Sequence, residues 1–219
     1  MNKELAFIFD LDGVIVDTAK YHYLAWRNLA NSLGFDFTEE QNELLKGVSR
    51  VQSLEILLSI GKLTLPEEKK QSLLVDKNTE YLGYVNKMTP DEILPGVNEL
   101  LDFLDANNSK YALGSASKNA PLILKKVGLI HRFTAIVDGN DVSKAKPDPE
   151  VFLIGAKKLN MKAENCVVVE DAIAGVQAAN EAKMISIGIG DSKVLKEADH
   201  VLKDMTGFTP EFLDELMIK

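Results

Sequence analysis

The 219-residue sequence has little of several residue types, and each shortage excludes a class of protein. Its single cysteine, Cys166, cannot form a disulfide within the chain, so we expect a reducing, cytoplasmic location. No apolar run approaches the roughly 18 residues that span a bilayer, so no membrane association is expected. Lysine and arginine form no cluster, and the net charge is −8, so we expect no binding to nucleic acid.

What the sequence does contain is an alternation of short apolar runs with amphipathic segments. Residues 5–9 form an apolar run typical of a buried parallel strand, and similar runs follow at 110–114, 135–137, 166–169 and 184–189. Helical patterns separate most of them, over residues 97–106, 119–127, 149–159 and 172–182. This alternation predicts an α/β protein with a Rossmann-like parallel sheet core.

Residues 17–88 interrupt the alternation, because they contain helical patterns and no convincing strand. The pattern predicts a helix over 18–33 that Gly34 closes, and a long helix from Pro66 toward Lys87. Two further helix starts are predicted by sequences typical of capping boxes, at 38–41 and 49–52. We therefore predict a helical cap domain, residues 17–88, inserted into an α/β core domain made of residues 1–16 and 89–219.

The first predicted strand ends in an acidic motif, Asp10-Leu11-Asp12-Gly13. Residues two apart on a strand point to the same side, so both carboxylates can face one site. In an open α/β sheet, ligands bind beyond the carboxyl ends of the strands. Two carboxylates this close repel each other, and Mg²⁺ is the prime candidate to offset that repulsion. Taken alone, such a motif is more often an exposed acidic turn than a catalytic site.

Three more polar motifs follow predicted strands. In Gly114-Ser115-Ala116-Ser117-Lys118-Asn119, a hydroxyl and the amides at a helix start can hold phosphate, although Ser117 could simply cap the helix. Lys146, held next to a proline, can supply a fixed positive charge, whereas we interpret Lys144 as a solvated loop lysine. Glu170 and Asp171 could cap the next helix or complete a metal site with Asp10.

With these four motifs, the chain resembles the haloacid dehalogenase superfamily over its whole length. The resemblance implies that Asp10 is a nucleophile, that Asp12 is the general acid and base, and that Ser115 and Lys146 bind phosphate. It also implies Mg²⁺ bound by Asp10, the carbonyl of Asp12, Glu170 and Asp171. A carboxylate that attacks phosphorus forms an aspartyl phosphate, which divides a difficult transfer into two steps.

Within the superfamily, the stretches at 17–26, 46–50 and 115–119, together with Ser53, resemble the β-phosphoglucomutases. That resemblance implies conversion of β-glucose 1-phosphate to glucose 6-phosphate, with β-glucose 1,6-bisphosphate as the activating intermediate. It implies that Thr18 and His22 tie Asp12 to the closed cap. Arg50 would grip the distal phosphate, supported by Ser117 and Asn119. The sugar pocket and the remainder of the phosphate loop would be formed by Trp26, Lys46, Gly47, Ser53, Ala116 and Lys118.

Other interpretations remain open from the residues alone. A phosphatase for sugar phosphates or other phosphomonoesters would share the same core, and a non-catalytic module could bind Mg²⁺ and phosphate without turnover. Trp26 and His22 could be packing residues, and Lys46 and Arg50 could lie on a solvated face. We expect a monomer whose partner is a small sugar phosphate, and a cap that closes over the core to exclude water.

Overall fold

Six parallel strands form one sheet within residues 4–218, which are the residues that the computed structural model describes. The strands lie in the order β3-β2-β1-β4-β5-β6. The first strand therefore lies in the middle of the sheet, where Ile8 is in register with Ala112 and Val168. The bounds are β1 Ala6–Phe9, β2 Tyr111–Gly114, β3 Ala135–Val137, β4 Cys166–Glu170, β5 Ile185–Ile189 and β6 His200–Leu202.

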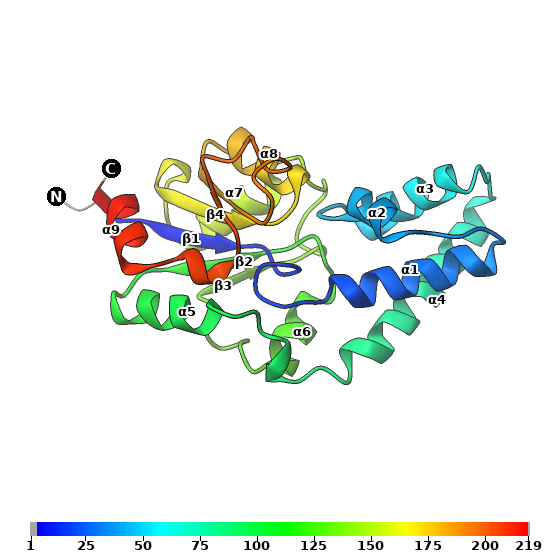
Figure 1. The fold of residues 1–219 in the computed structure, drawn as a ribbon, viewed down its shortest axis with the longest axis horizontal. Helices are drawn as coiled ribbons and strands as arrows, with labels where there is room; N and C mark the ends of the chain where they lie inside the picture. Colours follow the sequence, from blue (N-terminus) through cyan, green and yellow to red (C-terminus); the bar gives the residue numbers. More distant parts are fainter. Residues whose placement is uncertain (1–3, 219) are drawn as a thin grey trace.

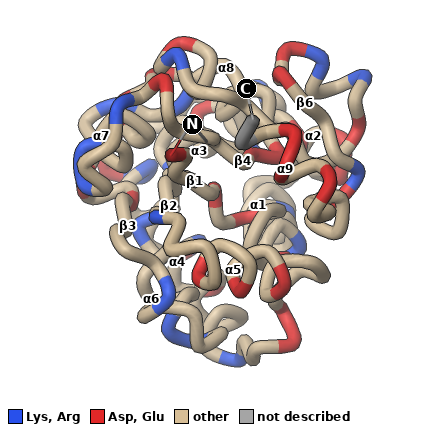
Figure 2. The backbone as a smooth tube through the Cα atoms, turned by 90° about the vertical axis from the view of Figure 1, so that its left-hand side faces the viewer, with Lys and Arg blue, Asp and Glu red and all other residues tan. Residues whose placement is uncertain are grey.

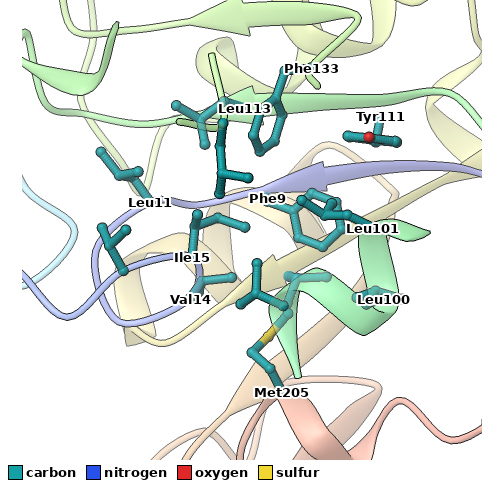
Figure 3. Packing of buried hydrophobic residues seen from close by; sticks show 14 of the residues in the cluster. Phe9, Leu11, Val14, Ile15, Leu100, Leu101, Tyr111, Leu113, Phe133 and Met205 are labelled. Atoms are coloured by element: carbon teal, nitrogen blue, oxygen red, sulfur yellow. The ribbon is translucent and has the colours of Figure 1, made fainter. Parts of the chain in front are cut away.

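Helices cover both faces of this sheet, because both faces of the strands are apolar (Figure 1). On one face Phe7 and Phe9 pack with residues of α5, α6 and α9, and Figure 3 shows Phe9 among Leu101, Leu113 and Phe133. On the other face Ile8 packs with residues of α7 and α8. These helices are α5 Val97–Ala106, α6 Ala120–Lys126, α7 Glu150–Lys158, α8 Ile173–Glu181 and α9 Pro210–Ile218.

Between β1 and α5 the chain forms a separate group of helices beyond one end of the sheet, far from the two termini (Figure 1). They are α1 Ala19–Ser32, α2 Glu39–Asn42, α3 Arg50–Ile60 and α4 Glu67–Val85. Their apolar faces enclose a hydrophobic cluster of their own around Trp26, Leu57 and Leu73. Below, residues 17–88 are called the cap segment, and residues 4–16 with 89–218 the core segment. Their division into two domains stays a prediction.

Four short 3₁₀ helices complete the fold, at Glu43–Leu45, Pro90–Glu92, Ala163–Asn165 and Met205–Gly207. The second of these lies where the chain returns to the core segment. There Val16 forms an isolated bridge with Ile93, and the Asp17 amide donates to the Glu92 carbonyl. The two passages of the chain between cap and core segments therefore lie side by side.

The sequence-based element assignments are largely confirmed, with three corrections. At 38–41 the capping box is present in both directions between Thr38 and Gln41. At 49–52 only the Ser49 side chain accepts, from the Gln52 amide, so the second box is half formed. Pro66 lies just before the long helix instead of in its first turn, and that helix ends at Val85. Strand β6 was missed, because its three half-buried residues form no apolar run.

Acidic and basic residues are interspersed along the backbone in the end-on view of Figure 2. Within the described residues, no helix is both long enough and apolar enough to cross a membrane. Cys166 is buried at the start of β4.

Candidate active site

A cavity of about 400 Å³ lies between the core and cap segments, beyond the carboxyl ends of the central strands. Most of the site residues that the sequence predicts line this cavity. The core segment contributes Asp10, Asp12, Ser115, Ala116, Ser117, Lys118, Asn119 and Asp171. The cap segment contributes His22, Trp26, Lys46, Gly47, Arg50 and Ser53. Three others, Thr18, Lys146 and Glu170, are buried outside the lining.

Asp10 directly follows the buried strand β1, and its amide donates to the Val169 carbonyl of β4 at 2.9 Å. The Asp12 amide donates to Oδ2 of Asp10 at 3.1 Å, which fixes the loop that both aspartates share. Gly13 then turns the chain with φ +80°, and a Cβ at this position would overlap the Asp171 carboxylate. Glycine is therefore required for the acidic motif to approach Asp171 so closely.

Lys146 lies behind Asp10 and is almost fully buried. Its Nζ donates to Asp10 Oδ1 at 2.6 Å and to Glu170 Oε1 at 3.2 Å. Burial by itself would lower the pKa of Lys146, but the carboxylates of Asp10 and Glu170 outweigh burial and raise the pKa. This lysine stays charged and holds the Asp10 carboxylate in one orientation.

Three carboxylates at the strand ends, those of Asp10, Glu170 and Asp171, offer oxygen atoms that all lie within 4.8 Å of one another. Burial raises the pKa of Glu170 to about 8 and that of Asp171 to about 7, with Asp10 adding to both shifts. Gly175 leaves room for the Glu170 side chain, which a Cβ there would overlap. An all-oxygen set with excess negative charge fits a hard divalent cation such as Mg²⁺.

Asp12 has a buried carboxylate oxygen, Oδ1, with no hydrogen-bond partner among the described residues. Burial, and after it the negative charge of Asp10, raise the pKa of Asp12 to about 7. A carboxyl group with a pKa near neutrality can both give and take a proton, as a general acid and base must. Thr18 is buried at the N-cap position of α1, and its side chain makes no capping hydrogen bond.

The loop after β2 is organised by its own hydroxyl groups. Ser115 is buried, and its Oγ accepts from the Ser117 amide at 3.1 Å. The Ser117 Oγ accepts in turn from the Asn119 amide at 3.2 Å. Ser117 thus shapes the loop ahead of α6, whose N-cap position belongs to Asn119. The simple helix-cap interpretation of Ser117 is therefore wrong.

The loop before α3 brings the cap segment against the acidic cluster. Gly47 has φ +72°, and a Cβ there would lie 3.0 Å from the Ala172 Cβ of the core segment. Next to it, Lys46 Nζ lies 3.7 Å from Asp171 Oδ2 and 3.0 Å from Glu43. Lys46 and Arg50 are both partly buried in the cavity wall, so neither lies on a solvated face. Trp26 belongs to the cap cluster and also lines the cavity.

The structure adds a residue that the sequence reasoning missed, Lys77 of α4. It is 2% exposed, and its Nζ lies 2.9 Å from His22 Nδ1 and 4.6 Å from the centre of the Trp26 ring. Burial, and after it the positive charge of Arg50, lower the pKa of Lys77 to about 7. Burial, Lys77 and Arg50 also lower the pKa of His22. The available signal was a lysine on the apolar stripe of α4, four residues before buried Tyr81.

Comparison with known proteins agrees with this geometry. The family model of haloacid dehalogenase-like hydrolases matches residues 5–183. The chain belongs to that family. Its match covers β1 to β4 with the four strand-end motifs, so the superfamily assignment made from the sequence is confirmed.

Relatives inside the haloacid dehalogenase-like family include two kinds of enzyme. A β-phosphoglucomutase of Bacillus subtilis is 42% identical over 212 residues, which cover 96% of this chain and 94% of that protein. A phosphorylated carbohydrates phosphatase of Thermotoga maritima is 31% identical over 203 residues, which cover 90% of this chain and 92% of that protein. The crystal structure of a β-phosphoglucomutase from Clostridium difficile superimposes with a TM-score of 0.92 at 43% identity, covering 98% and 96% of the two chains.

Proposed function

We propose that the protein is a phosphomutase that interconverts β-glucose 1-phosphate and glucose 6-phosphate through a glucose 1,6-bisphosphate intermediate. The observation that carries this proposal is the division of the cavity into two poles. The core wall presents the carboxylates of Asp10, Asp12 and Asp171 beside the lysines Lys118 and Lys144, whereas the cap wall presents the basic groups of Lys46, Arg50 and Lys77 and no carboxylate. A substrate with a phosphate at each end fits such a cavity, because one phosphate meets the nucleophile while basic groups hold the other.

In the proposed reaction, an oxygen of Asp10 attacks the phosphorus of the bisphosphate. The new Asp10–phosphorus bond forms as the bond from phosphorus to the sugar oxygen breaks, and Asp12 gives its proton to that leaving oxygen. For the return step, Asp12 removes the proton of a sugar hydroxyl, which attacks the aspartyl phosphate and restores free Asp10. Lys146 and Ser115 would hold the transferring group.

Mg²⁺ is the cofactor that the acidic cluster fits, with Asp10, Glu170, Asp171 and the Asp12 carbonyl as its proposed protein ligands. When bound, it would offset negative charge on the transferring phosphoryl group. The proposal is supported by the raised pKa values of Glu170 and Asp171, because burial and the charge of Asp10 disfavour their ionised forms and a bound cation would favour them.

The cap segment supplies the proposed acceptor side. Arg50 has a planar fork that matches phosphate oxygens, and Ser117 and Asn119 of the core segment line the same cavity. His22 and Lys77 also line the cavity, and the His22 amide donates to the carbonyl of buried Thr18 at 3.1 Å. Closure of this segment would exclude water, which would otherwise hydrolyse the aspartyl phosphate. We further propose that the enzyme acts as a cytoplasmic monomer.

The test mixes enzyme and Mg²⁺ with β-glucose 1-phosphate and a trace of the bisphosphate. Glucose 6-phosphate should form rapidly, with little free phosphate, while the α anomer should give none. Release of free phosphate without isomerisation would overturn the mutase assignment.

A second candidate, a sugar-phosphate phosphatase, is favoured by the 31% identical phosphatase of T. maritima. It would use the same Asp10 and Asp12 but transfer the phosphoryl group to water. The assay above separates the two activities by their products. A non-catalytic module would show neither product, and it would leave the raised pKa of Asp12 without a use.

A further inference from the structure

One hydrogen bond joins the phosphate loop of the core segment directly to a cap helix. The side-chain amide of Asn119 donates to Oδ1 of Asn78 on α4 at 3.0 Å, and both residues are partly buried. Asn119 lines the cavity. Asn78 directly follows Lys77, the buried lysine that contacts His22. The bond therefore links Asn119, a proposed phosphate-binding residue, to the helix α4 that carries Lys77 and contacts His22 through it.

This bond ends a series of hydrogen bonds that begins at Ser115, directly after β2, the strand that pairs with β1. Ser115 Oγ accepts from the Ser117 amide, Ser117 Oγ accepts from the Asn119 amide, and the Asn119 side chain donates to Asn78. Each step is a direct hydrogen bond, so the loop and the first contact on α4 form one connected unit. A shift of Asn119 on phosphate binding would be transmitted to α4 through a single bond.

We propose that Asn78 is a positioning residue that couples occupancy of the distal phosphate site to closure of the cap segment. This rests on the proposed function, in which Asn119 contacts that phosphate. The side-chain amide of Asn119 carries two N–H groups. While one donates to Asn78, the other remains directed elsewhere, so Asn78 fixes the plane of the amide that the phosphate meets. The same bond holds α4, which carries the cavity-lining Lys77, against the loop after β2.

The chain offers a matched control for an ordinary contact between the two segments. Lys126 Nζ of α6 donates to the Asn86 carbonyl just after α4, at 3.1 Å. Neither residue lines the cavity. Removing this bond loosens the same two segments without touching the phosphate loop.

The experiment compares wild type, Asn78→Ala and Lys126→Ala in two measurements. The first is the ratio of kcat/KM for phosphorylation of Asp10 by β-glucose 1,6-bisphosphate to that for β-glucose 1-phosphate, which has no second phosphate. The second is the ratio of glucose 6-phosphate to free phosphate produced. For Asn78→Ala we expect both ratios to fall about tenfold, with kcat for Asp10 phosphorylation within about twofold of wild type. Lys126→Ala should match wild type in both.

Unchanged ratios in Asn78→Ala would overturn the proposal, and so would an equal fall in Lys126→Ala, which would indicate general loosening. If Asn78→Ala does not fold, Asn78→Ser decides by the same criteria, since its side chain is too short to reach Asn119. The two proposals fail separately. A wild type that only releases phosphate refutes the mutase assignment, while the preference for bisphosphate over monophosphate still judges Asn78.

Discussion

The two walls of the cavity carry opposite excesses of charge. The core wall and the residues behind it contain four buried or partly buried carboxylates, Asp10, Asp12, Glu170 and Asp171, with Lys146 as their buried counter-charge. The described cap residues that line the cavity include Lys46, Arg50 and Lys77 and no carboxylate. All the carboxylates of the cavity lining therefore lie on the core wall, whereas the charged side chains of the cap wall are all basic.

Burial shifts the pKa values of titratable groups on both sides of the cavity. Burial raises the pKa values of Asp12, Glu170 and Asp171 on the core side and lowers those of Lys77 and Arg50 on the cap side. In each case the charged form is disfavoured because water has been removed and too few partners replace it. The core pole suits a cation, and the cap pole suits an anion such as a phosphate. The predictions below test the two poles separately.

Replacing the proposed nucleophile, Asp10, should have the largest effect. Asp10→Asn keeps the shape of the side chain but cannot form an aspartyl phosphate, so turnover should fall at least about 10⁴-fold. Phosphoenzyme formation, measured with labelled bisphosphate, should vanish. Asp17→Asn is the matched control, because Asp17 follows in the same loop and its side chain is 47% exposed beside Lys20. If Asp10→Asn kept substantial turnover, another nucleophile would have to act.

At the cap pole, Arg50→Ala should lower kcat/KM for the bisphosphate roughly 100-fold, because the distal phosphate loses its forked partner. Phosphorylation of Asp10 by acetyl phosphate, which has no distal phosphate, should change little. Arg27→Ala serves as control, since Arg27 is half exposed on α1 and faces Asp36. Equal losses with both phosphoryl donors would contradict the assignment of Arg50 to the distal site.

Lys77 should make the stability of the free protein depend on pH. Its folded pKa of about 7 lies below the ordinary value of 10.5, so the unfolded chain binds more protons between these values. Stability should therefore rise as pH increases from about 7 to 10, by roughly 2–4 kcal/mol. The charged or titratable groups near Lys77 include Arg50, Asp12, His22, Glu80 and Tyr81.

Denaturant unfolding at several pH values measures this effect. Lys77→Met should remove most of the rise, whereas Lys69→Met, on an exposed part of the same helix, should keep it. A wild type and a Lys77→Met protein with parallel stability curves would show that Lys77 stays charged in the folded state.

The smallest effect concerns the metal. Mg²⁺ at ten times its dissociation constant should stabilise the protein by about 1.4 kcal/mol, because it binds only the folded acidic cluster. Thermal unfolding with and without a chelator measures the shift. Asp171→Asn should abolish the shift, and Asp76→Asn, an exposed acid of the cap segment, should retain it. A shift that survives Asp171→Asn would place the cation elsewhere.

The two segments also differ in how much of them the sequence predicts. In the core segment, five strands and four helices were located to within one or two residues, because buried parallel strands form apolar runs with polar ends. The site followed from the same property, since Asp10, Ser115 and Asp171 each come directly after a strand. Strand β6 escaped because an edge strand of three half-buried residues has no such pattern.

In the cap segment, helices could be predicted but not the residues that they bring together. His22 and Lys77 are 55 residues apart, and only the packing of α1 on α4 places their nitrogen atoms 2.9 Å from each other. A lysine on an apolar stripe was the sole sign of Lys77, and Asn78 gave none. The capping motif at 38–41 was predicted correctly because both of its hydrogen bonds are local.

The sequence alone determined the α/β core, the helical insertion and the acidic motif with its strand-end partners. All of these depend on local periodicity and on the rule that parallel strands end at one edge of a sheet. The tertiary structure decided that Lys77 is buried against His22, that Gly13 and Gly47 permit close approach, and that Asn78 contacts the phosphate loop. These depend on distances between elements far apart in the chain, which local preferences do not specify.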